Sequence, residues 1–109
     1  MAEKNLEISA LCDVYSPLLP EKQRLALQYY YDEDLSLSEI AEHAGISRQG
    51  VRDQIKHAEN QLKEYENALG LYEKIKKTDE IIAGLEVIAE KLDSKELLDL
   101  LVSLKQLYE

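Results

Sequence analysis

Tryptophan and phenylalanine are absent from the sequence, and cysteine occurs once, at Cys12, among 109 residues. A single cysteine excludes an intrachain disulfide and a zinc site built on cysteines, and its apolar helical setting predicts a buried structural thiol. No run approaches 18 apolar residues and no basic-then-apolar signal opens the chain, so we expect a cytoplasmic protein without a membrane partner. Only two prolines and four glycines interrupt a composition with hardly any strand signal. The sequence therefore predicts an all-α protein with a small core of Leu, Ile, Ala and Tyr.

Basic residues are outnumbered by acidic ones, and the formal net charge is −9 at pH 7. A strongly acidic protein repels phosphate overall, which excludes an indiscriminate nucleic-acid coat. Residues 46–63 are the exception, because they carry +2 while the other 91 residues carry −11. The charged residues of this segment are Arg48, Arg52, Lys56 and Lys63, with Asp53 and Glu59. A weakly basic face on an acidic body fits a specific, salt-sensitive binder, or a protein whose main partner is another protein.

The segment 35–62, LSLSEIAEHAGISRQGVRDQIKHAENQL, has the pattern of two helices joined by a tight turn. Ser36 and Glu39 have the spacing of a capping box for a helix over 37–44. Gly45 suits the left-handed conformation that ends this helix, and Ser47 is placed to cap a second helix that begins at Arg48. Five apolar residues are spaced to pack the two helices together: Ile40, Ala41, Ile46, Val51 and Ile55. Caps, glycine and apolar spacing together indicate a helix-turn-helix.

A helix-turn-helix offers the N-terminal outer face of its second helix to the major groove of DNA. With Val51 and Ile55 facing inward, five polar residues remain on the outer face and are the candidate nucleic-acid-binding residues: Arg48, Gln49, Arg52, Asp53 and Lys56. Arginine and glutamine form bidentate pairs with base edges, which suits Arg48 and Gln49, whereas Arg52 and Lys56 suit phosphates. DNA is the default ligand, and RNA is an alternative through phosphate contacts. An ordinary helical hairpin with a polar face is the structural alternative.

Short motifs within residues 19–56 are shared with known families: Lys22-Gln23-Arg24, Tyr29-Tyr30, Ser38-Glu39-Ile40-Ala41-Glu42, Ser47-Arg48-Gln49, Asp53 and Ile55-Lys56. Over Leu19–Ile55 the chain resembles region 4 of the sigma-70 factors, which reads the −35 promoter element. Nearly its whole length is similar to the YlxM family of small bacterial helix-turn-helix proteins. The resemblance implies a homeodomain-like or winged-helix-like three-helix core.

The genes of the YlxM family typically lie beside those of the signal recognition particle (SRP) protein or its receptor. The resemblance therefore implies a regulatory role in the SRP pathway, with SRP RNA or the SRP protein as partner. The chain departs from the family pattern at Gly50, Arg52 and His57, where alanine, tyrosine and arginine are common.

Helices are also predicted on both sides of the helix-turn-helix. One spans about Lys4–Tyr15, and a second spans about Glu21–Tyr31, with its three tyrosines packing inward or along the rim. The apolar face predicted for the first is Leu6, Ala10, Leu11, Val14 and Leu18. The second helix of the helix-turn-helix reaches about Asn67, and the apolar stripe slips by one residue near Gly70. We therefore predict a helix-turn-helix domain over 1–69 and a C-terminal helical extension over 70–109.

The predicted extension begins with an apolar 3.5-residue repeat formed by Leu71, Ile75, Thr78, Ile82, Leu85, Ala89 and Leu92. Asp93 and Glu96 have capping-box spacing for a last helix. That helix has a broad apolar face, predicted to mediate packing or dimerisation: Leu97, Leu98, Leu100, Leu101, Leu104, Leu107 and Tyr108. So apolar a face requires a partner surface. A homodimer is favoured, and the alternatives are folding back onto the core or a hairpin of the last two helices.

No catalytic constellation is recognisable in the sequence. His43 and His57 lie on polar helix faces, and Asp32-Glu33-Asp34 lacks the spacing of a calcium loop. No phosphate-binding loop or nucleophile motif occurs, so we expect no enzyme, cofactor, metal or small-molecule substrate. Two functions remain: a dimeric nucleic-acid-binding regulator, or an adaptor that uses its acidic surface and leucines to hold a protein such as the SRP GTPase.

Overall fold

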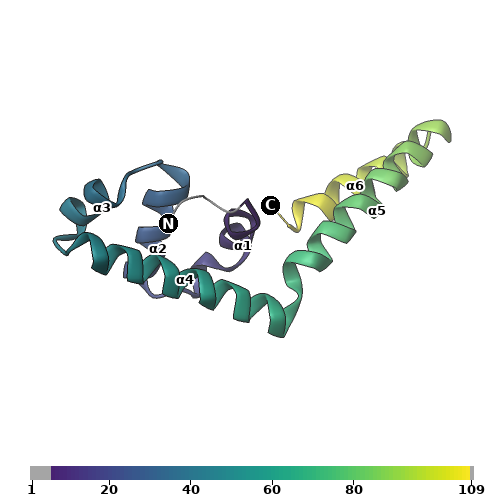
Figure 1. Cartoon of the computed structure of the whole chain (residues 1–109). Helices are drawn as coiled ribbons and strands as arrows, with labels where there is room; N and C mark the ends of the chain where they lie inside the picture. The colour runs from purple at the N-terminus through teal and green to yellow at the C-terminus, as the bar shows by residue number, and fades with distance from the viewer. Residues whose placement is uncertain (1–5, 109) are drawn as a thin grey trace. The chain divides into compact units, whose positions relative to one another are not determined.

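The computed structural model describes residues 6–108, which are almost entirely helical and include no strand (Figure 1). This confirms the predicted all-α class. The chain divides between Gly70 and Leu71 into two compact units.

The first unit is built around α4 (Arg48–Leu69). Before it come α1 (Leu6–Tyr15), the 3-10 helix η1 (Ser16–Leu18), α2 (Glu21–Leu27), the π-helix η2 (Gln28–Asp32) and α3 (Leu37–Ala44). Three helices, α1, α2 and α3, contact α4. The buried side of α4 is the stripe of Val51, Ile55, Ala58 and Leu62, each 0% exposed. Steps of four, three and four residues keep this stripe on one helix face.

The helix-turn-helix has the predicted caps. Ser36 Oγ accepts the Glu39 N–H at 3.1 Å, and Glu39 Oε1 accepts the Ser36 N–H at 3.3 Å, which completes the capping box. Gly45 ends α3 in the left-handed conformation with φ 69°. Ser47 Oγ then accepts the Gly50 N–H at 3.0 Å and caps α4. These local bonds fix where α3 ends and α4 begins, and they confirm the helix-turn-helix.

Replacing Gly45 with alanine is expected to destabilise the first unit by about 1 kcal/mol or more. No atom lies within 4 Å of a Cβ added there, so the cost comes from the positive φ and not from a clash. Gly84 is the matched control, because it has equally open space but lies inside α5 without a positive φ. Gly84→Ala should raise stability by up to about 1 kcal/mol. Urea unfolding followed by circular dichroism measures both changes, and a stabilised Gly45→Ala variant would contradict this explanation.

The face that α1 buries differs from the predicted one. Its buried side chains, with that of the residue after η1, are Ile8, Leu11, Tyr15 and Leu19. Leu6 and Leu18, predicted to be inward, are 87% and 57% exposed. The prediction was wrong for these two residues, whereas Leu11 is buried as predicted. Contact with α4 selects the buried face, and on this face the Tyr15 hydroxyl donates to Glu66 Oε1 at 2.5 Å. The predicted start at Lys4 lies outside the described residues.

The tyrosine group coincides with a change of helix type. The helix predicted over 21–31 is α-helical only in α2 and continues as the wider π-helix η2. Tyr30 is buried, and its ring contacts the Tyr31 ring edge-on, with ring centroids 5.2 Å apart. The Tyr31 hydroxyl donates to Glu59 Oε2 at 2.6 Å. The tyrosines therefore pack inward and along the rim, and they do not form one stacking platform. Apolar periodicity in the sequence does not distinguish a single π-turn from an α-helix.

In the second unit, α5 (Leu71–Lys91) and α6 (Lys95–Gln106) pack side by side as a hairpin (Figure 1). Its small core consists of Ile82, Ala89 and Leu101, with the partly buried Leu97, Leu98 and Leu104 against them. Four of the predicted packing leucines thus contact α5 of the same chain, whereas Leu107 and Tyr108 are 76% and 49% exposed. Leu85 and Leu92 were predicted to face inward, but they are 38% and 68% exposed.

The turn into α6 is capped by Ser94 and not by Asp93. Ser94 Oγ accepts the Leu97 N–H at 3.2 Å. Asp93 has φ 51°, a left-handed conformation, whereas an N-cap residue has extended backbone. The predicted capping box of Asp93 and Glu96 is therefore wrong, since the N-cap is the next residue, Ser94. Asp93 instead takes the left-handed conformation in which the chain leaves α5.

Candidate nucleic-acid interface

The first two and a half turns of α4 present a polar surface opposite the buried Val51 and Ile55. All five predicted nucleic-acid-binding residues on this surface are exposed: Arg48, Gln49, Arg52, Asp53 and Lys56. Within residues 6–108, no ion pair engages the three cations of this set. Their charges are therefore available to an anion approaching from solvent.

Two of these residues are bonded to each other. Gln49 Nε2 donates to Asp53 Oδ1 at 2.9 Å, one helical turn further on. The bond leaves the Gln49 amide oxygen free and restrains the side chain on the outer surface of α4. Asp53 is thus a positioning residue for Gln49 as well as a nearby negative charge. The i,i+4 spacing of the pair is the sequence signal that predicts such a bond.

An open hollow of about 400 Å³ lies where the start of α3 meets the start of α4. It is lined by Ser36, Leu37, Ser38, Arg48, Gln49 and Arg52. The lining holds two arginines and no acidic side chain, and the N-terminal end of a helix dipole favours anions. The arrangement suits a phosphate oxygen held by a guanidinium group and serine hydroxyls.

Sequence reasoning missed the contribution of α3 to this hollow. It assigned Ser36 a capping role only and gave Ser38 no role at the surface. The pairing of the α3 start with Arg48 and Arg52 depends on how the turn folds α4 back, which no local pattern specifies. The one signal available was the serine-rich start of the first helix, a composition suited to phosphate contacts.

A second, smaller cavity has a volume of about 200 Å³. Its lining comes mostly from α2 and α3: Lys22, Leu25, Ala26, Tyr29, Ile40, His43, Ala44, Ile46 and Gln54. Ile46 was predicted to point into the core, but it is 38% exposed, because it sits at the mouth of this cavity. His43 is exposed, as predicted, and stacks on Tyr29 with ring centroids 5.5 Å apart.

Cys12 is half-buried and free. Burial raises the pKa of its thiol to about 11, and the nearby carboxylates Asp32, Asp13 and Glu59 act in the same direction. Since the thiolate is the nucleophilic form, this cysteine is a poor nucleophile at neutral pH.

The part of the chain that the structure describes contains no group of three or more His, Cys, Asp or Glu side chains able to hold a metal ion. No helix between residues 6 and 108 is long and apolar enough to cross a membrane.

The capped α3, the glycine turn and the exposed start of α4 define a helix-turn-helix protein. Residues 2–101 match the family described as "Putative helix-turn-helix protein, YlxM / p13 like". The chain is 45% identical to the UPF0122 protein BH2485 of Halalkalibacterium halodurans over 98% of its length and 99% of the relative. It is 49% identical to a UPF0122 protein of Clostridium botulinum over 82% and 83% of the two chains, and 38% identical to one of a Geobacillus species over 98% and 99%. The chain therefore belongs to this YlxM-like family.

Proposed function

We propose that the protein is a non-enzymatic nucleic-acid-binding regulator that uses the exposed start of α4. The observation that carries the proposal is the open hollow where Arg48 and Arg52 meet the N-terminus of α3 without an acidic side chain in the lining. In this proposal Arg48 and Gln49 contact base edges, and Arg52 and Lys56 contact phosphates. Asp53 orients Gln49 through their hydrogen bond.

DNA is the default ligand in this proposal, and SRP RNA is the alternative. The family resemblance supports a link to the SRP pathway. The exposed start of α4 favours DNA, because the major groove of B-DNA admits an α-helix whereas that of A-form RNA is deep and narrow. The net charge of −9 opposes non-specific binding to nucleic acid, and phosphate contacts by Arg52 and Lys56 would make the remaining binding salt-sensitive. The protein acts in the cytoplasm as a homodimer, with residues 1–69 binding nucleic acid and residues 70–109 pairing the chains.

A second candidate is an adaptor that holds a protein such as the SRP GTPase without binding DNA specifically. Two observations favour it. Outside residues 46–63 the chain carries −11, which suits a basic protein partner. The second unit also exposes several large apolar side chains, and exposed apolar patches are typical of protein contacts.

Fluorescence anisotropy with random duplex DNA and with SRP RNA, each across a salt series, tests the proposal. We expect log affinity to fall linearly with log salt. Lys56→Ala should weaken binding to all duplex sequences alike and reduce the slope by about 0.9, the contribution of one phosphate contact on B-DNA.

The outcomes separate the candidates. Preference for one nucleic acid identifies the ligand class. An unchanged slope in Lys56→Ala removes this residue from the phosphate contacts. Absence of binding to both nucleic acids at low salt contradicts the regulator and leaves the adaptor, which would then be tested by titrating the SRP protein.

A further inference from the structure

The hairpin of the second unit buries very little of its own apolar surface. Among its described residues only Ile82, Ala89 and Leu101 are buried, and they form the seam between α5 and α6. Independent units of about 40 residues or fewer usually need a disulfide, a metal or another chain to be stable. The single cysteine lies in the first unit, so no disulfide can supply this stability.

A second apolar stripe runs along α5 beside the seam. Ile81, Leu85, Ile88 and Leu92 follow each other at steps of four, three and four residues and are 63%, 38%, 52% and 68% exposed. This spacing keeps them on one helix face and is that of a helix-packing seam. The predicted repeat contained Leu85 and Leu92 but omitted Ile81 and Ile88.

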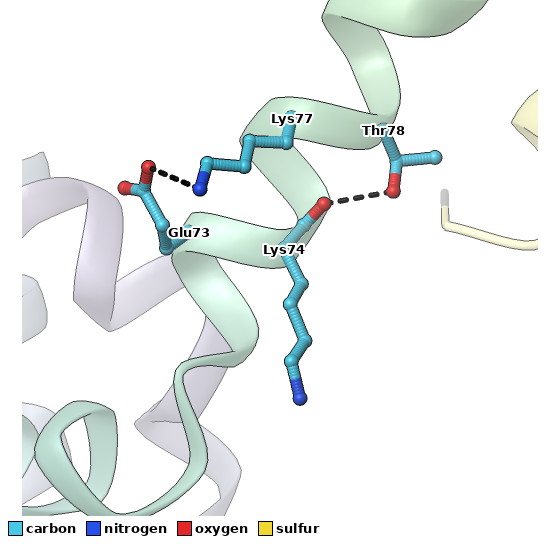
Figure 2. Close-up of polar contacts among 4 residues, drawn as sticks. All are labelled: Glu73, Lys74, Lys77 and Thr78. Carbon is cyan, nitrogen blue, oxygen red and sulfur yellow. Dashed lines mark hydrogen bonds and ion pairs between the residues drawn. The ribbon is translucent and has the colours of Figure 1, made fainter.

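The stripe is confined to the second half of α5. On the same face of α5, the first half of the helix carries Lys74 and Thr78 instead of apolar residues. Figure 2 shows that the Thr78 hydroxyl donates to the Lys74 carbonyl, at 2.7 Å, while the Lys74 side chain extends away from the helix. Glu73 and Lys77 form an i,i+4 ion pair nearby at 3.9 Å (Figure 2). A partner surface for the apolar stripe therefore lies along residues 81–92.

The outer surface of α6 continues this apolar region. Leu100 and Leu107 are 62% and 76% exposed, and they alternate with the partly buried Leu97 and Leu104 at steps of three, four and three residues. Leu100 comes one residue before the seam residue Leu101, just as Ile81 and Ile88 come one residue before Ile82 and Ala89.

The α5 and α6 stripes lie on the same side of the hairpin. Two antiparallel helices are related by a local two-fold axis perpendicular to the hairpin plane, so equivalent positions face the same side. The ion pair between Lys105 Nζ and Glu86 Oε1, at 3.2 Å, supports this equivalence. Lys105 comes four positions after the seam residue Leu101, and Glu86 comes four positions after the seam residue Ile82, so the two occupy equivalent positions. The ion pair therefore lies on one side of the hairpin, and both apolar stripes lie on the opposite side. We call this opposite side the apolar face and define it as Ile81, Leu85, Ile88, Leu92, Leu100 and Leu107.

We infer that the apolar face binds the same face of a second copy of this chain, so that two hairpins form a four-helix bundle. The inference rests on the homodimer of the proposed function and names its surface. Taking roughly 180 Å² for each leucine or isoleucine when fully exposed, the face presents about 650 Å², close to the ~800 Å² per partner of a standard interface. A two-fold dimer needs a self-complementary surface, and a face of Leu and Ile alone meets this need without leaving a buried polar group.

Pairing also completes the core that each hairpin lacks. In a four-helix bundle, the residues at the seam and those on the apolar face would all belong to one common hydrophobic core. Val87 and Val102 are 52% and 53% exposed and lie off the apolar face, so they would stay outside this core.

Sedimentation equilibrium of the full chain tests the inference. The wild-type protein, 12.5 kDa per chain, is expected to sediment as a dimer at micromolar concentration. Ile88→Glu should raise the dissociation constant at least about 100-fold, because the carboxylate would be buried without a partner. Val87→Glu is the matched control: Val87 is the preceding residue, equally exposed at 52%, and points away from the face. It should leave the dimer intact.

A monomeric wild-type chain overturns the inference and indicates that another partner covers the face. A dimer that survives Ile88→Glu, or one that Val87→Glu disrupts equally, also overturns it. If Ile88→Glu loses its helical circular dichroism, Leu100→Glu with Val102→Glu as control makes the same comparison on α6. Nucleic-acid binding is measured separately on the same variants, so a failure of the dimer is distinguishable from a failure of the nucleic-acid role.

Discussion

Leu62→Ala is expected to lower the free energy of unfolding of the first unit by about 2–5 kcal/mol. Leu62 is 0% exposed and ends the stripe by which α4 packs on the other helices of the first unit. Truncation removes its apolar packing and leaves a cavity that close-packed neighbours fill only in part. Urea unfolding followed by circular dichroism measures the destabilisation.

Leu69→Ala is the control, because it makes the same change in the same helix at a side chain that is 53% exposed. Leu69→Ala should lower the free energy of unfolding by less than about 1 kcal/mol, as is usual for substitutions of exposed side chains. Equal destabilisation in the two variants would contradict the view that α4 is anchored by its first four turns. It would mean instead that the end of α4 is buried in solution.

The helix-turn-helix was predictable because its signals are local. A capping serine, a glycine with positive φ and inward residues three or four apart act within a few residues of themselves, and they agree with one another at α3 and α4. The face of α1 was not predictable in this way. Leu6 and Ile8 are equally apolar, and only contact with α4 selects Ile8 for burial.

The residues of the candidate site were predictable only by elimination. Once Val51 and Ile55 are assigned to the core, the exposure of Arg48 and Arg52 follows from helical periodicity. The contribution of Ser38 to the hollow does not follow, because it arises from the fold of the turn. The same limit explains the second unit, where α5 carries two apolar stripes one residue apart and periodicity alone does not rank them.

The double variant Arg48→Ala/Arg52→Ala is expected to weaken nucleic-acid binding about 10- to 1,000-fold near 0.1 M salt. The two guanidinium groups line the same hollow, and each is placed for charge-assisted bonds that alanine cannot replace. For duplex DNA the slope of log affinity against log salt should fall in magnitude by about 0.9 for each phosphate that the variant no longer neutralises. If Arg48 contacts a base edge and Arg52 a phosphate, the single variants differ: Arg48→Ala lowers sequence discrimination, and Arg52→Ala weakens all sequences alike.

Lys76→Ala/Lys95→Ala is the matched control for this double variant. It also removes two positive charges, from exposed positions in the second unit outside the apolar face. The control should bind almost as the wild type does, because neither lysine belongs to the surface at the start of α4 and exposed charges are screened over about 10 Å at this salt. A reduction in affinity as large as that of the arginine variant would mean that net charge, and not the surface of α4, governs binding. Unchanged binding in the arginine variant would remove the nucleic-acid role from this surface and favour the adaptor, whose binding residues are then to be sought on the acidic and apolar surfaces of the chain.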